Sequence, residues 1–300
     1  MNLRFLDGVM PAITTPFNAD DSIDHGFLAR HTELLMGSGC SAIVALGSLG
    51  EGGTLTATEK RAVLGTVVRA AGSGPVIAGI GALSTAEAVN LAHTAEAAGC
   101  AALMVLPPYA YSTDAREMEA HVSAVMAATA LPCVLYNNPI AYKTDFKPER
   151  VAELCAQHAN LVAMKESSAD VRRVSAIRAL LGDRLRLVCG VDDLIVEGIA
   201  AGASGWIAGL VDAFPHESVR LFDLARAGRA DEARRLYEWF LPLLRLDTVP
   251  KFVQLIKLAQ EMLGLGSARV RAPRLALVGA ELAEARAIIQ HAIDTRPKLD

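Results

Sequence analysis

The chain has 300 residues, a formal net charge of −4 and a pI near 6.0, and 52% of its residues are hydrophobic while only 5% are aromatic. This acidic balance argues against nucleic acid as the main partner. No stretch approaches the ~20 apolar residues that span a membrane, and residues 1–7 lack the apolar run of a signal peptide. The cysteines show no C-x-x-C spacing, so we interpret them as small buried side chains in a reducing compartment. We therefore expect a cytoplasmic enzyme that acts on a small molecule.

Short apolar segments alternate with amphipathic stretches along the first two thirds of the chain. The segments that we interpret as strands are residues 9–14, 42–46, 76–79, 102–106, 133–136, 161–165, 187–190 and 205–208. The stretches with helical periodicity between them are residues 24–38, 58–71, 85–98, 115–128, 148–158, 170–181 and 193–201. Several of these stretches begin with a typical helix start, such as Thr56 followed by Glu59. Several end at a glycine, such as Gly99 or Gly202.

Strand–helix alternation with short loops predicts a parallel sheet, and this number of repeats predicts a closed (β/α)₈ TIM barrel rather than an open doubly wound sheet. Beyond Gly209 the pattern is helical, over residues 215–227, 230–246, 250–263 and 279–293. The first of these is expected to be the eighth barrel helix. We thus predict an α/β barrel over residues 1–228 and a C-terminal helical extension, residues 229–300, packed on it.

The functional residues of such a barrel lie at the C-terminal ends of its strands. Lys165 ends the apolar segment that begins at Leu161, and a buried lysine is costly to keep charged, so its pKa falls. A neutral lysine amine is a competent nucleophile for a Schiff base with a ketone. The alternative is that Lys165 points outward and pairs with a carboxylate.

Two further strand ends carry groups that suit this chemistry. Tyr136 closes the neighbouring apolar strand, and its hydroxyl could relay protons or could simply be satisfied by packing. The loop at residues 47–51 can present backbone N–H groups and the Ser48 hydroxyl to a carboxylate, although strand-to-helix turns need glycine in any case. Asp192 and Asp193 either cap a helix or contact a polar substrate.

Several other site types find no support in the sequence. The histidines mostly fall in expected helices without H-x-H or H-E-x-x-H spacing, so we expect no metal site. No G-x-G-x-x-G or G-x-x-x-x-G-K-[ST] motif is present, and we expect no nucleotide or other cofactor. The segment at residues 202–205 precedes a strand, which favours a close-packed turn over a phosphate loop.

Four motifs lie at four different strand ends: Gly47-Ser48-Leu49-Gly50-Glu51, Tyr136-Asn137-Asn138-Pro139, Val162-Ala163-Met164-Lys165-Glu166 and Gly190-Val191-Asp192-Asp193. In this order they resemble the dihydrodipicolinate synthase/N-acetylneuraminate lyase family, over essentially the whole chain. The resemblance implies a barrel with a C-terminal extension that assembles as a homotetramer, a dimer of dimers. It also implies that Lys165 forms a Schiff base with carbon 2 of a 2-oxo acid. Tyr136 would then relay protons, and Ser48 with the loop N–H groups would bind the carboxylate.

The resemblance also assigns substrate-binding positions, namely Gly47, Leu49, Gly50, Asn138, Ala141, Tyr109, Tyr111, Gly190 and Ile207. Ala141 corresponds to the arginine with which the synthase holds the carboxylate of aspartate semialdehyde. The second relay tyrosine of the synthase falls near Ala110, so the relay could be completed by Tyr109, by Tyr111 or by water.

Residues 136–145 and 246–254 look more like a subgroup associated with hydroxyproline breakdown, the deaminase acting on 1-pyrroline-4-hydroxy-2-carboxylate. We therefore expect first a Schiff-base lyase that dehydrates and deaminates this cyclic imine. The alternatives are dihydrodipicolinate synthase, which uses pyruvate and aspartate semialdehyde, and a pyruvate-dependent aldolase for a sugar-derived acid. A non-catalytic protein that binds 2-oxo acids is the alternative from a different class.

Overall fold

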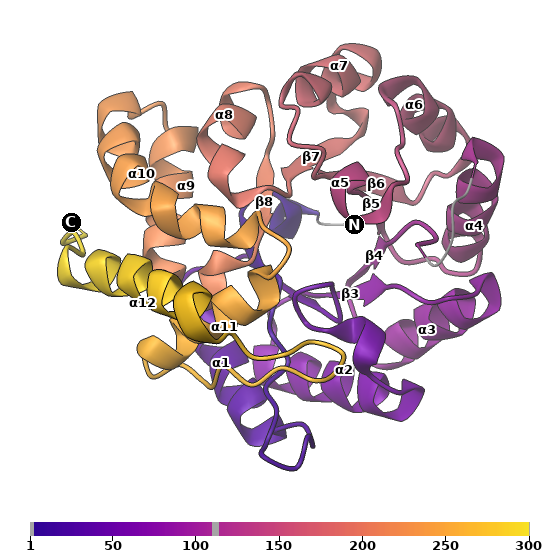
Figure 1. Ribbon diagram of the computed structural model, residues 1–300. Helices are drawn as coiled ribbons and strands as arrows, with labels where there is room; N and C mark the ends of the chain where they lie inside the picture. Colours follow the sequence, from indigo (N-terminus) through magenta and orange to yellow (C-terminus); the bar gives the residue numbers. More distant parts are fainter. Residues whose placement is uncertain (1–2, 110–113, 300) are drawn as a thin grey trace.

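The computed structural model describes residues 3–109 and 114–299 and forms a barrel of parallel strands surrounded by helices (Figure 1). The strands follow the order β1-β8-β7-β6-β5-β4-β3-β2, and a bridge between Ala12 and Val44 joins the two ends of this sheet. The (β/α)₈ TIM barrel predicted from the alternation is therefore confirmed. The strands are β1 (Val9–Pro11), β2 (Ile43–Ala45), β3 (Val76–Ile80), β4 (Ala102–Val105), β5 (Cys133–Asn137), β6 (Leu161–Glu166), β7 (Arg186–Cys189) and β8 (Gly205–Ala208).

The helices follow the predicted order, and three of them come after the barrel. Those of the barrel are α1 (His25–Gly37), α2 (Ala57–Ala71), α3 (Thr85–Ala97), α4 (Ala115–Ala127), α5 (Pro139–Tyr142), α6 (Pro148–Gln157), α7 (Arg172–Leu181), α8 (Ile195–Ala200) and α9 (Pro215–Arg226). The C-terminal helices are α10 (Ala230–Leu244), α11 (Phe252–Met262) and α12 (Gly279–Asp294). No helix within residues 3–109 and 114–299 is long and apolar enough to cross a membrane.

Two local features differ from the sequence prediction. The short helix α5 was not expected, and it begins where the Asn138 side chain accepts a hydrogen bond from the Ala141 N–H. Strand β1 ends at Pro11 instead of residue 14, and beyond it the Thr14 hydroxyl donates to Gln260 Oε1 of the extension over 2.9 Å. Both differences lie at the C-terminal end of the barrel, where regular pairing gives way to side-chain contacts.

Other local predictions are confirmed. Thr56 and Glu59 form a reciprocal capping box at the start of α2. Gly99 follows the end of α3 with φ +88°, and Gly202 follows the end of α8 with φ +109°. Residues with a Cβ rarely adopt such positive φ angles. Every residue of β1 to β5 and β8 is buried, which explains why these strands appear in the sequence as continuous apolar runs. All the cysteines are free and buried.

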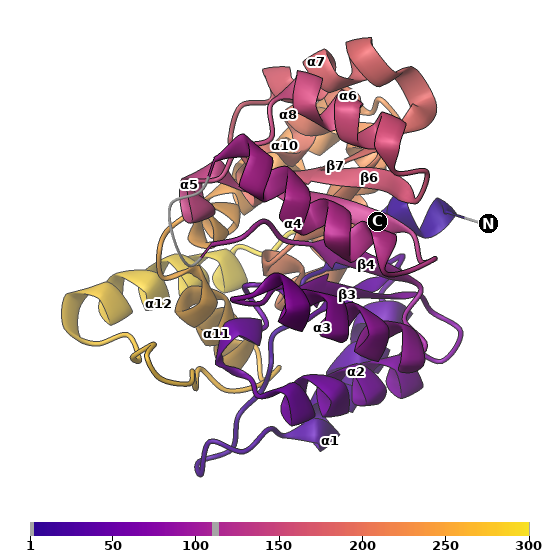
Figure 2. The same ribbon diagram turned by 90° about the vertical axis from the view of Figure 1, so that its right-hand side faces the viewer.

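The C-terminal helices and the segments between them, residues 229–299, are called the extension below. Figure 2 shows α11, α12 and α5 at one end of the barrel and the N-terminus at the opposite end. A buried ion pair fixes the extension there: Lys257 Nζ of α11 lies 2.6 Å from Glu51 Oε1, and the two side chains are 2% and 0% exposed. The other Glu51 oxygen accepts the Arg271 N–H over 3.1 Å. Glu51 therefore connects the loop after β2 to two parts of the extension.

We expect Lys257→Met to lower the free energy of unfolding by about 3–5 kcal/mol, because the substitution leaves the Glu51 carboxylate buried without its ammonium partner. Urea titration measures this loss. The matched control is Lys251→Met, since Lys251 is half exposed and pairs with Glu281 on the surface, where the pair stabilises little. The double variant Glu51→Gln/Lys257→Met should recover much of the loss, and equal stability of the Lys257→Met and Lys251→Met proteins would contradict the prediction.

Candidate active site

A cavity of about 220 Å³ opens at the C-terminal ends of the barrel strands. It is closed partly by loops of the barrel and partly by the extension. Its lining residues are Ala12, Gly47, Ser48, Leu49, Met104, Tyr136, Asn138, Ala141, Tyr142, Lys165, Gly190, Gly209, Asp247, Phe252 and Arg274. Lys165, Tyr136 and Ser48, which the strand-end rule and the resemblance had selected, therefore lie around one volume.

Lys165 points into this cavity from β6 and is 7% exposed. Its Nζ lies 4.5 Å from the centre of the Tyr136 ring. Tyr136 occupies the position of β5 that pairs directly with Lys165. Gly190 leaves room for the side chain, because a Cβ there would lie 2.7 Å from Lys165 Cε. Among the described residues no carboxylate lies within 4.0 Å of this amine, so the alternative of an outward-facing ion pair does not fit the geometry.

Burial is the dominant influence on the charge of Lys165. Loss of hydration lowers the pKa of its ammonium, while the nearby carboxyl groups of Asp247 and Asp192 act in the opposite direction. A buried lysine with a lowered pKa keeps a larger fraction of neutral amine near pH 7 than an exposed lysine does. Only the neutral amine has the lone pair that attacks a carbonyl carbon.

Hydroxyl groups form a hydrogen-bonded cluster in the same cavity as the lysine. Asn138 Nδ2 donates to Tyr136 Oη over 3.0 Å, and the hydroxyls of Ser48 and Tyr142 are hydrogen-bonded to each other. The Tyr136 and Tyr142 rings meet edge to face with their centres 5.8 Å apart. Burial raises the pKa of both phenols, so each is a neutral hydroxyl that can donate and accept a proton.

Tyr142 is the hydroxyl neighbour that the sequence analysis did not assign. It lies on α5, a helix of one turn that was not predicted, and no periodic signal marks it. Tyr109 does not line the cavity but packs against the Tyr142 ring, with a centre-to-centre distance of 5.7 Å. Tyr111 and Ala110 lie outside the described residues.

The loop after β2 places Gly47, Ser48 and Leu49 in the cavity wall. The N–H groups of Glu51 and Gly52 turn back to the carbonyls of Ser48 and Gly47. In the described part of the chain, no backbone carbonyl accepts from the N–H of Ser48 or Leu49. These groups suit a carboxylate ligand.

Two other predicted substrate-binding positions lie behind the wall of the cavity. Gly50 packs against the backbone of Ile13, because a Cβ at position 50 would lie only 2.9 Å from the Ile13 carbonyl oxygen. Ile207 is 1% exposed within β8. The cavity lining includes neither residue, whereas Asn138, Ala141 and Gly190 belong to it.

Asp192 serves neither of the two roles considered for it, because its side chain caps neither of the helical segments that begin at residues 192 and 195 and does not line the cavity. It is fully buried, and it accepts from Trp206 Nε1 over 3.1 Å and from the N–H groups of Gly209 and Leu210 over 3.1 and 2.9 Å. Burial raises its pKa to about 6. Asp192 therefore holds the end of β8 in place. Asp193 lies outside the cavity lining and is 3.7 Å from Arg245.

The extension contributes Asp247, Phe252 and Arg274 to the cavity. None of them was predicted as a site residue, although Asp247 and Phe252 lie in a segment that carried part of the resemblance. No helical periodicity or strand-end position marks these side chains, because they reach the cavity only through the way the extension packs on the barrel.

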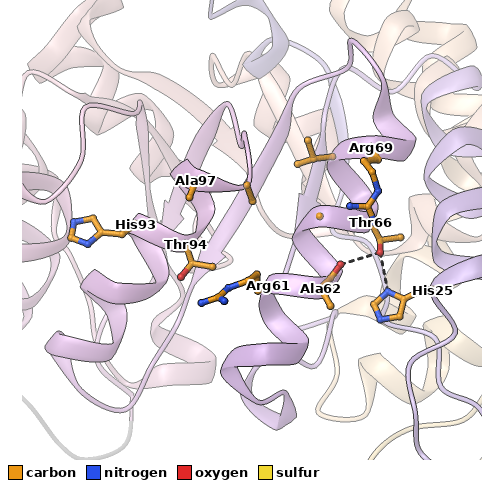
Figure 3. A pocket seen from close by; sticks show the side chains of 11 residues that line it. His25, Arg61, Ala62, Thr66, Arg69, His93, Thr94 and Ala97 are labelled. Carbon is orange, nitrogen blue, oxygen red and sulfur yellow. Dashed lines mark hydrogen bonds between the residues drawn. The ribbon is translucent and has the colours of Figure 1, made fainter.

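A larger hollow of about 760 Å³ lies between α2 and α3, on the outside of the barrel (Figure 3). Thr66 Oγ1 donates to the Ala62 carbonyl over 3.0 Å and lies 2.9 Å from His25 Nδ1. In Figure 3 the His93 side chain lies far from this pair. The lining of this larger hollow contains neither a lysine nor a tyrosine. The smaller cavity around Lys165 is therefore the better candidate for an active site.

A family model described as the dihydrodipicolinate synthetase family matches residues 5–292 of the chain. The chain belongs to this family. Members of the dihydrodipicolinate synthetase family are class I Schiff-base lyases, and the protein is an enzyme of this type.

Several members of the dihydrodipicolinate synthetase family match most of the chain. The 4-hydroxy-tetrahydrodipicolinate synthase of Methanothrix thermoacetophila is 34% identical over 89% of this chain and 90% of its own. That of Shewanella sp. (strain ANA-3) is 37% identical over 78% and 79%. Among solved structures, the same synthase from Methylacidiphilum fumariolicum SolV is 28% identical with a TM-score of 0.92, covering 96% of each chain. A prophage protein of the family from E. coli K12, in complex with pyruvate, is 25% identical with a TM-score of 0.89, covering 95% and 98%.

We expect Tyr142→Phe to slow Schiff-base formation with pyruvate about 100-fold, because the ring contacts remain while the hydroxyl partner of Ser48 is lost. Trapping of the adduct with borohydride measures the rate. Tyr136→Phe should show a similar loss, and the double variant should be much less impaired than the product of the single effects, since hydroxyls that act as a unit are not additive. Multiplicative losses would show that the two hydroxyls act separately.

Proposed function

We propose that Lys165 forms the Schiff base of this lyase with carbon 2 of pyruvate and that the resulting enamine adds to the aldehyde of aspartate semialdehyde. The observation that carries the proposal is the buried amine of Lys165, which lies over the Tyr136 ring and in one cavity with the hydroxyls of Ser48 and Tyr142. The chain would thus have 4-hydroxy-tetrahydrodipicolinate synthase activity, as the names of its relatives suggest.

The cavity holds groups for the first steps of this route. The N–H groups of Ser48 and Leu49 bind the pyruvate carboxylate, which directs carbon 2 toward Lys165. The amine attacks the carbonyl, and the Tyr136 hydroxyl passes a proton from the attacking nitrogen to the carbonyl oxygen, which gives a neutral carbinolamine. Loss of water from the carbinolamine then gives the iminium. Loss of a proton from carbon 3 turns the iminium into an enamine, whose carbon 3 attacks the aldehyde. Addition of the acceptor's amine to carbon 2 then closes the ring and releases Lys165.

The second substrate carries its own carboxylate, which needs a cationic partner. The arginine expected from the resemblance is replaced by Ala141, but the extension brings another guanidinium, that of Arg274, into the cavity wall. Its side chain is 30% exposed, and its Nη1 lies 3.8 Å from Glu51 Oε2, a distance that leaves its hydrogen-bond donors available to a ligand. We therefore assign Arg274 as the partner of the acceptor carboxylate.

Deamination of 1-pyrroline-4-hydroxy-2-carboxylate, which the sequence analysis placed first, becomes the second candidate. Ala141 favours it, because a substrate whose only carboxylate adjoins carbon 2 needs no second cationic partner. The named relatives support the synthase more strongly than the deaminase.

Borohydride trapping followed by peptide mass spectrometry tests the Schiff base. With pyruvate, we expect a reduced adduct on the peptide that contains Lys165, and no adduct in Lys165→Ala. Absence of an adduct from the folded wild-type protein, or its attachment to another lysine, would refute the proposed chemistry.

Turnover assays distinguish the two substrates. We expect consumption of pyruvate together with aspartate semialdehyde, and a drop in kcat/KM of roughly 10- to 100-fold for Arg274→Ala, mainly through the KM for the semialdehyde, because one charge-assisted contact is lost. Release of ammonia from the hydroxypyrroline without pyruvate would favour the deaminase instead. A pyruvate adduct with neither activity would leave an aldolase that accepts another aldehyde.

A further inference from the structure

One carboxyl group of the cavity has no role in the chemistry described so far. Asp247 ends a 3₁₀ turn, Arg245–Asp247, that follows α10 in the extension, and its side chain lines the cavity with Lys165. Its Oδ1 is buried and has no hydrogen-bond partner among the described residues. A buried polar atom without a partner is costly, and one whose side chain lines a cavity is a candidate for contact with a bound or reacting group.

The barrel is shaped to accept this carboxyl group. A Cβ at Gly209, just after β8, would lie 2.0 Å from Asp247 Oδ1 and 2.7 Å from its Cγ. Only a glycine at position 209 leaves this space free. Asp192 fixes the backbone there through the N–H groups of Gly209 and Leu210.

The charges around Asp247 come from several elements of the barrel and from the extension. These groups are Lys165 and Tyr136 on β6 and β5, Asp192 and Asp193 after β7, Asp212 after β8, and Arg245 and Arg274 of the extension. Burial and the neighbouring Asp192 raise the pKa of Asp247 well above its usual range, and Lys165 opposes this rise. Of the charges near Lys165, that of Asp247 acts on it most strongly.

Asp192 and Asp247 differ in what they can offer to a reacting group. Each oxygen of Asp192 already accepts a hydrogen bond from the barrel. Oδ1 of Asp247 accepts none among the described residues, and the Asp247 residue lines the cavity. Formation of a Schiff base from a neutral amine creates one positive charge in a buried site. Such a charge is stable there only with a counterion.

We propose that Asp247 is a catalytic residue of Schiff-base formation, a step that rests on the proposed function of Lys165. The carboxylic acid of Asp247 gives its proton to the hydroxyl of the carbinolamine on Lys165. The carbon–oxygen bond then breaks, water leaves, and the nitrogen lone pair forms the carbon–nitrogen double bond. One neutral carbinolamine and one neutral acid thus give water, an iminium cation and the Asp247 carboxylate, which pair with each other.

The test compares Asp247→Asn with the wild-type protein in borohydride trapping of pyruvate over a range of pH. We expect the variant to form the adduct at least about 100-fold more slowly. In the wild type the rate should rise as Lys165 loses its proton and fall at higher pH as Asp247 loses its own, and the two apparent pKa values belong to the coupled pair. In Asp247→Asn, the trapping rate should still rise with pH as Lys165 loses its proton, but it should no longer fall at higher pH.

Two further variants separate this role from a structural one. Asp231→Asn makes the same carboxyl-to-amide change at an exposed position of the extension and should trap pyruvate as the wild type does. Gly209→Ala keeps Asp247 but places a methyl group where its carboxyl group lies, and should reproduce the loss even where Asp247→Asn is poorly folded.

Other outcomes would overturn the inference. Trapping by Asp247→Asn at the wild-type rate, or a slow variant that keeps the fall at high pH, would show that another acid acts, while leaving the Schiff base on Lys165 intact. Failure of the wild-type protein to trap pyruvate on Lys165 would instead refute the proposed function itself.

Discussion

The buried ion pair between Glu51 and Lys257 constrains the geometry of the whole site. Glu51 ends the loop that carries Ser48, and Lys257 lies on α11 of the extension, so the pair fixes the two sources of cavity residues relative to each other. Its desolvation is compensated by further hydrogen bonds, from the Arg271 N–H to Glu51 and from Lys257 to the Arg269 carbonyl. The cavity depends on this contact because barrel loops alone do not enclose it.

Burial away from water shifts the pKa values of several titratable groups in and around the cavity. The same burial that lowers the pKa of Lys165 raises that of Asp247, Asp192 and Tyr136. Each group is thereby shifted toward its neutral form, in which amines attack and acids donate. In the proposed reaction, a charge that forms would find its counterion inside the site instead of in water, which would keep the reorganisation small.

The strands and most helices could be predicted because their signals are local. Apolar runs, caps and glycine stops act within a few residues, and the rule that barrels carry function at strand ends then selected Lys165 and Tyr136. Tyr142, Asp247 and Arg274 escaped prediction, since their positions depend on a one-turn helix and on the docking of the extension. The helix-cap role considered for Asp192 is wrong, because its carboxylate accepts hydrogen bonds from the backbone that follows β8. The sequence could not show this, since an aspartate before a helix has the same local pattern in both cases.

The extension follows the barrel in the sequence, and this order has a consequence for biosynthesis. Domains form from the N-terminus as the ribosome extends the chain, so the barrel residues, Lys165 among them, emerge before Asp247, Phe252 and Arg274 exist. Until these residues have been made, the wall of the cavity around Lys165 is incomplete. The complete set of cavity residues around Lys165 therefore exists only after the extension has docked on the barrel.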